Sequence, residues 1–144
     1  MSSGKVVALH LKPAPGELEP VDRLVAVAGE GFVGDGNYGR RKRQVLFVAT
    51  DEIAAFGYAP GTLREQITVE LAGLQSLPLG TIVQAGEASF EITMDCDPCT
   101  KMALRLGEDP VAFKAKTDRH RGMLAIVRDG GEIRVGDEVR VTHA

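Results

Sequence analysis

Short apolar runs, separated by turns that contain glycine or proline, dominate this sequence. The 144 residues include 17 glycines and 7 prolines, which are spread along the chain instead of being gathered in a linker. Val, Ile and Leu fill the runs between the turns, and near the end of the chain apolar and charged residues alternate. Runs of this kind are typical of β-strands. We expect strands at residues 6–11, 21–28, 44–49, 66–69, 81–85, 89–94, 123–128, 132–135 and 138–142.

Helical patterns are few, and we expect helices only at residues 51–56, 98–106 and 110–117. Thr50 or Asp51 is the predicted N-cap of the first helix, and Asp109 that of the third. Asp129-Gly130 lies between two predicted strands and indicates a hairpin. Many short strands with few helices predict one mostly β domain over residues 1–144. Its expected architecture is an antiparallel β-barrel with a few short peripheral helices.

Composition excludes several classes of protein. The net charge of −3 and an aromatic content of 5% argue against a nucleic-acid-binding surface. No apolar run approaches the roughly 20 residues of a membrane span, so we expect no membrane association. Two cysteines exclude a disulfide scaffold, and we expect a cytoplasmic protein. Since one C-x-x-C is accompanied by no close pair of histidines, we expect no zinc site.

The segment Cys96-Asp97-Pro98-Cys99 is the leading candidate for chemistry. It follows a predicted strand, and Pro98 suits the opening of a helix, which would put Cys99 in the first helical turn. Backbone N–H groups at that position, with Lys101 nearby, stabilise a thiolate. The alternatives are two inert buried cysteines or a thioredoxin-like dithiol. Against the dithiol, the strands look hairpin-linked, and we expect no βαβ pattern before the motif.

Three other groups of polar residues are candidate binding sites. Arg64, Gln66 and Thr68 alternate along a predicted strand, where a guanidinium beside an amide suits a heterocycle or an oxyanion. Residues 34–39 form a glycine-rich turn whose N–H groups suit an anion. Two basic clusters could hold phosphate or sulfate, at residues 40–43 and at Lys114, Lys116, Arg119 and Arg121. A solvated surface or a flexible loop is the alternative for each group.

The order of these motifs resembles the MOSC domain, the family named after the C-terminal domain of molybdenum-cofactor sulfurases. The resemblance covers about residues 5–142 and is carried by their shared order. The segments are Gly34-Asp35, Arg43-Gln44-Val45-Leu46, Pro60-Gly61, Leu63-Arg64-Glu65, Leu77-Pro78-Leu79-Gly80-Thr81, Ala85-Gly86-Glu87, Pro98-Cys99 and Ile133-Arg134-Val135-Gly136-Asp137-Glu138-Val139.

The resemblance implies a mostly antiparallel β-barrel, in agreement with the strand count. It also implies that Cys99 is the family's cysteine, which carries sulfane sulfur or meets molybdenum, and that Arg64 belongs to a cofactor pocket. Gln66 stands where the family has asparagine, and Asn37 where it often has histidine. The residues expected to bind the cofactor, molybdopterin, are Arg64, Gln66, Thr68, Asp35, Asn37, Arg43 and Lys101.

We therefore expect a sulfur-carrier protein in which Cys99 accepts sulfur as a persulfide and Cys96 is the resolving thiol. The acceptor would be a metal or the molybdenum cofactor. Because 144 residues leave no room for a desulfurase domain, sulfur would come from a partner such as a cysteine desulfurase. One alternative is a molybdenum-dependent reductase of N-hydroxylated compounds, with Cys99 as metal ligand and an electron-donor protein as partner. Another is a non-enzymatic cofactor-binding module.

Overall fold

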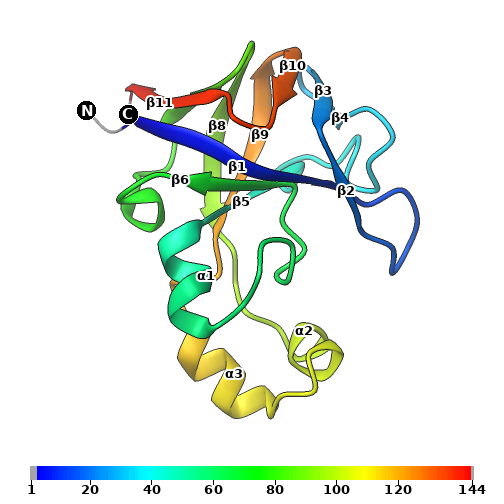
Figure 1. The fold of residues 1–144 in the computed structure, drawn as a ribbon, viewed down its shortest axis with the longest axis vertical. Coiled ribbons are helices and arrows are strands. Elements are labelled where there is room, and N and C mark those ends of the chain that lie inside the picture. The colour runs from blue at the N-terminus through cyan, green and yellow to red at the C-terminus, as the bar shows by residue number, and fades with distance from the viewer. Residues whose placement is uncertain (1–2, 144) are drawn as a thin grey trace.

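A computed structural model describes residues 3–143, which form a β-barrel with helices on one side (Figure 1). The strands are β1 (Ser3–Leu11), β2 (Glu19–Val21), β3 (Arg23–Val27), β4 (Gly31–Phe32), β5 (Val45–Ala49), β6 (Ile67–Glu70), β7 (Ile82–Ala85), β8 (Ala88–Asp95), β9 (Met123–Asp129), β10 (Gly131–Arg134) and β11 (Glu138–His143). The helices are α1 (Thr50–Phe56), α2 (Thr100–Arg105), α3 (Pro110–Thr117) and the 3₁₀ turn η1 (Leu74–Ser76). None of the helices in the described residues has the length and apolar character that a membrane crossing needs.

Seven strands close the barrel in the order β1, β11, β7, β8, β9, β5 and β6. The closing pair, β1 with β11, is antiparallel, and β2 adds to the free part of β1. A second, three-stranded sheet has the order β10-β3-β4. The prediction of a mostly β barrel with short peripheral helices is confirmed.

Two predictions about the strands, the extent of one strand and one hairpin, are wrong because the chain changes sheets. The expected strand 21–28 is divided at Asp22, since β2 pairs with β1 whereas β3 pairs with β10. The expected hairpin at Asp129-Gly130 does not form: β10 leaves β9 and pairs with β3 instead. The backbone carbonyl of Ala26 in β3 lies only 2.7 Å from where a side chain on Gly130 would begin, so this crossing needs glycine there.

The expectation of no βαβ pattern ahead of Cys96 is also corrected. β5 and β6 are parallel and are connected through α1, the one parallel pair among the strand pairings of the described residues. All five residues of β5 are buried, as is usual for a strand covered on both faces. β8, which leads into the cysteines, is antiparallel to both of its neighbours.

Two apolar clusters explain why β5 is covered on both sides. Val45, Phe47 and Ala49 belong to the barrel core, where Phe47 meets Phe90 edge to face with ring centroids 5.2 Å apart. The opposite face, with Leu46 and Val48, belongs to a cluster beneath the helices. That cluster also includes Ile53, Leu63, Cys96, Met102, Ala103, Phe113 and Leu124. The cysteine motif therefore sits where helices meet the barrel wall.

Helix boundaries follow local sequence signals closely. Gly57 ends α1 in the left-handed conformation, and the Asp109 side chain caps α3 by accepting a hydrogen bond from the Ala112 N–H, both as predicted. The N-cap of α1 is Ala49, which precedes both predicted candidates, Thr50 and Asp51, and it has no side-chain hydrogen bond. Burial of Ile53 against the barrel stabilises this short helix in place of a cap.

Candidate functional site

The two cysteines occupy different environments at the junction of β8 and α2. Cys96 is buried, and its backbone N–H donates to the carbonyl of Gly122. Cys99 is exposed and is the N-cap of α2, one position before the expected first turn. Its Sγ accepts a hydrogen bond from the Met102 N–H at 3.4 Å. Cys99 is thus the accessible sulfur of the pair, and its backbone setting is fixed.

Both cysteines line a cavity of about 450 Å³. Seven cationic side chains line the same cavity, and no aspartate or glutamate does. These cations are Lys12, Arg40, Arg43, Arg64, Lys101, Arg105 and Arg121. Lys12 follows β1, two of the cations lie in α2, and the other four lie in the three loops that precede β5, β6 and β9. In a chain of net charge −3, this concentration gives the cavity a locally positive potential that would attract an anion.

Arg121 is the most unusual of these cations. Its side chain is 6% exposed, and its Nε and Nη1 atoms have no hydrogen-bond partner in the protein. Burying a guanidinium without hydrogen-bond partners destabilises a protein, so buried arginines are normally paired or hydrogen-bonded. Because Arg121 also lines the cavity, an anion bound there would supply the missing partner.

Electrostatic coupling connects the cavity residues. Burial lowers the pKa of Lys12, and the nearby charges of Arg64 and Arg121 lower it further against the opposing effect of Asp35. Burial also raises the pKa of the Cys96 thiol, while Arg121 and Arg43 oppose this shift. Cys96 is therefore kept protonated to higher pH than an exposed cysteine. An anionic ligand would relieve the repulsion among the cations.

Six of the nine residues predicted to form the site line this cavity: Cys96, Cys99, Arg64, Asn37, Arg43 and Lys101. The alternation predicted that Arg64, Gln66 and Thr68 share one strand face, but Arg64 does not share a face with the other two. It precedes β6, adopts a left-handed backbone with φ 63°, and donates from Nη2 to the carbonyl of Glu17. This turn carries the Arg64 guanidinium out to the cavity.

Asp35, Gln66 and Thr68 lie outside the cavity lining and are buried. Gln66 accepts the Leu46 N–H at 2.8 Å and donates to Asp35 at 3.0 Å. Asp35 also accepts the backbone N–H of Lys12, and Thr68 donates to Glu65. In this arrangement the three residues hold the strands and loops that carry the cavity side chains.

Sequence reasoning missed Lys12 and Arg105 and did not single out Arg121 from its cluster. Arg121 alone of that basic cluster lines the cavity, and Lys116 instead forms an ion pair with Glu108 at 2.6 Å. Arg105 lies in the last turn of α2, the short helix whose N-cap is Cys99. The predicted helix at this position was therefore a signal that Arg105 lies near Cys99. Lys12 carried no local signal.

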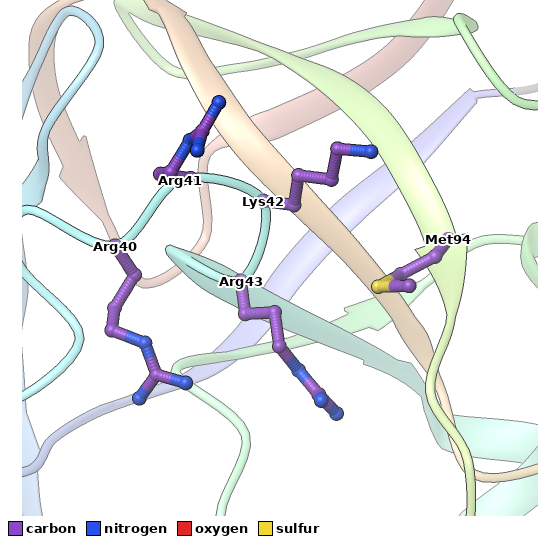
Figure 2. A pocket seen from close by; sticks show the side chains of 5 residues that line it. All are labelled: Arg40, Arg41, Lys42, Arg43 and Met94. Atoms are coloured by element: carbon purple, nitrogen blue, oxygen red, sulfur yellow. The ribbon is translucent and has the colours of Figure 1, made fainter.

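A second, open cavity of about 520 Å³ adjoins the first (Figure 2). Arg40, Arg41, Lys42, Arg43 and Met94 line it, and Arg40 and Arg43 are shared with the cysteine cavity. Figure 2 shows Arg40 and Arg43 extending from the same side of their segment, while Lys42 extends towards the strand that carries Met94. The two cavities thus form one continuous cationic surface.

The donor set suits an anion better than a bare metal ion. In residues 3–143, no three His, Cys, Asp or Glu side chains come together as a metal-binding group. Cys99 offers a single exposed sulfur, and the remaining polar atoms of the cavity are mostly N–H donors. These residues fit a cofactor that brings its own anionic groups and its own metal ligands.

Comparison with known proteins supports the architecture. The profile of the MOSC domain family matches residues 35–140. The YuaD protein from Bacillus subtilis has a similar structure, with a TM-score of 0.84 and 20% identity over 96% of each chain. YiiM from Escherichia coli has a TM-score of 0.73 and 18% identity, over 97% of this chain and 70% of that one. No curated protein matches the sequence.

Proposed function

The chain belongs to the MOSC domain family, and we propose that it is a sulfur carrier that accepts and delivers sulfur through Cys99. The family is linked to sulfur-transfer and reductase functions connected with the molybdenum cofactor. The observation that carries the proposal is the position of Cys99: an accessible sulfur beside a cavity with seven cations and no acid. A carrier of sulfur to an anionic acceptor needs this combination.

Loading is an exchange between sulfur atoms. The Cys99 thiolate attacks the outer sulfur of a donor persulfide, forms a new S–S bond and releases the donor cysteine as a thiol. The product is a Cys99 persulfide, and no net oxidation occurs. The Met102 N–H that contacts Cys99 Sγ helps to orient the attacking sulfur. The donor is a persulfide-bearing protein such as a cysteine desulfurase.

Release uses the second cysteine. The Cys96 thiolate attacks Sγ of the Cys99 persulfide, so that the outer sulfur leaves with its electron pair as hydrosulfide and a Cys96–Cys99 disulfide forms. A dithiol reductant then returns both cysteines to thiols. Because burial raises the pKa of Cys96, release becomes faster as the pH rises and more of this thiol is ionised.

The acceptor fits the cationic part of the cavity. We propose that Arg121, Lys12, Arg64 and Arg43 hold the anionic groups of a molybdopterin-type cofactor, with the unpartnered Nε and Nη1 of Arg121 as its most buried donors. When bound, the cofactor supplies a metal centre that takes up sulfide. Asn37 and Lys101 also line the cavity, whereas Asp35, Gln66 and Thr68 are buried outside its lining.

Intact mass spectrometry tests the proposal. Incubation of the reduced protein with cysteine persulfide should add one sulfur, about 32 Da, in a form removed by dithiothreitol. Cys99→Ser should lose this adduct, whereas Cys96→Ser should retain it and release hydrosulfide more slowly. Loading that persists in Cys99→Ser contradicts the mechanism. Stoichiometric molybdenum without any sulfur adduct would favour the reductase, with Cys99 as a metal ligand.

A further inference from the structure

The segment Arg40-Arg41-Lys42-Arg43, called here the basic segment, has no role in the sulfur chemistry just described beyond the two arginines at the cavity rim. All four side chains are exposed. None of them takes part in an ion pair within the described residues, whereas four of the eight other arginines do: Arg23, Arg128, Arg134 and Arg140. Four adjacent uncompensated charges repel one another. This repulsion would not stabilise a loop whose role is only structural.

The backbone of the basic segment is nevertheless held in place. Gln44 donates to the carbonyl of Arg40 at 2.7 Å, and Thr93 of β8 donates to that of Lys42 at 2.6 Å. Asn37 donates to the carbonyl of Arg43, also at 2.7 Å. Three of the four carbonyls are thus fixed by side chains, while the charged groups form no ion pair within residues 3–143. A fixed backbone lowers the entropy lost when such side chains bind a partner.

The location of the basic segment connects it with Cys99. Arg40 and Arg43 line both cavities, so a molecule that covers the segment also reaches side chains of the cysteine cavity. Arg41 and Lys42 line only the outer cavity. A protein that transfers sulfur must bring its own persulfide to Cys99, and it therefore needs a contact surface at this rim.

We propose that the basic segment docks an acidic surface of the protein that exchanges sulfur with Cys99; this inference rests on the proposed function. Charge complementarity supplies the recognition: a patch of Asp and Glu on the partner would replace the missing counter-charges. A protein fits better than a nucleic acid, because no aromatic side chain lines either cavity for base stacking. The chain as a whole is also acidic.

The test uses two synthetic peptides that each carry one cysteine, flanked by glutamates in one and by glutamines in the other. As persulfides, the acidic peptide should load Cys99 about tenfold faster than the neutral peptide at low salt, and added salt should remove the difference. Arg41→Gln combined with Lys42→Gln should remove most of this advantage, about fivefold, without touching the cysteine cavity. Lys5→Gln combined with Lys114→Gln makes the same charge change at exposed positions elsewhere and should have no effect.

Binding without sulfur separates this inference from the proposed function. Fluorescence anisotropy of the reduced, labelled acidic peptide should show salt-sensitive binding that the Arg41/Lys42 variant weakens and the Lys5/Lys114 variant does not. That result upholds the docking surface even if no peptide loads Cys99, in which case only the sulfur-carrier proposal fails. Equal binding of both peptides by the native protein overturns the docking surface. Tighter binding of single-stranded RNA than of the acidic peptide overturns it as well.

Discussion

At the scale of single residues, Arg121 connects stability with function. Burial removes its guanidinium from water, and the protein leaves Nε and Nη1 without partners. An unpaired buried charge is destabilising by several kcal/mol when it is fully desolvated. The position of Arg121 in the cavity lining indicates that the cost is offset when an anion binds.

Replacing Arg121 by Met should therefore stabilise the free protein. Methionine fills a similar volume without a charge, so the free energy of unfolding should rise by about 1–3 kcal/mol. Sulfate or phosphate should raise the melting temperature of the native protein at matched ionic strength, and Arg121→Met should lose most of that response. Urea unfolding and thermal shift measure the two effects. Arg128→Met, an exposed control, should change neither by much; a less stable Arg121→Met would contradict this account.

At the scale of elements, one polar network joins β1, β5 and β6. The Gln66 side chain accepts the N–H of Leu46 in β5, and its amide donates to Asp35, which in turn accepts the N–H of Lys12 after β1. Each of these groups is buried or partly buried. The network holds Lys12 and the strand end that carries Leu46 in position at the cavity wall.

Gln66→Leu should disrupt this network. The substitution leaves the buried Leu46 N–H without a partner and removes one of the two donors to Asp35 Oδ2, which keeps the Asn37 N–H. The free energy of unfolding should fall by about 1–3 kcal/mol. Hydrogen exchange at the Leu46 amide should accelerate more than exchange across β7 and β8. Gln84→Leu makes the same chemical change at an exposed position of β7 and should stay within about 0.5 kcal/mol. If Gln66→Leu left the free energy of unfolding nearly unchanged, the network would not contribute to stability.

At the scale of the whole molecule, barrel closure depends on close approach between β1 and its two neighbours. Gly4 pairs with Val139 of β11 and lies next to the end of β6. A Cβ at this position would lie 1.5 Å from the carbonyl oxygen of Glu70, which is backbone and cannot rotate away. Only glycine lets β1 close the barrel in this register.

Gly4→Ala should therefore open the closing pair. Moving β1 away from β6 costs packing and ladder hydrogen bonds, so we expect a loss of about 3 kcal/mol in the free energy of unfolding. Faster hydrogen exchange should appear in β1, β6 and β11, and the change should be absent in Ser3→Ala, whose side chain is exposed. An unchanged melting temperature would contradict the close contact.

The fold was more predictable than the site. Most strands and all three helices lie close to their predicted ranges, because alternation, glycine stops and the Asp109 cap are local signals. The place of Cys99 at the start of a helix was predictable for the same reason, since strand, proline and helix follow one another in the sequence. The buried positions of Gln66 and Thr68 were not predictable, because a polar residue in a strand looks the same whether it faces water or another polar side chain.

By itself, the sequence determined the strand-rich class, the helix ends, the cysteine motif and the resemblance to a family. All of these depend on neighbouring residues or on motif order. Only the tertiary structure decided that β10 pairs with β3 and that β5 runs parallel to β6. It alone also brought Lys12 and Arg121 to the cysteine cavity. The segments involved lie far apart in the chain. Which of them come together depends on strand pairing, and strand pairing is determined by the packing of the whole barrel.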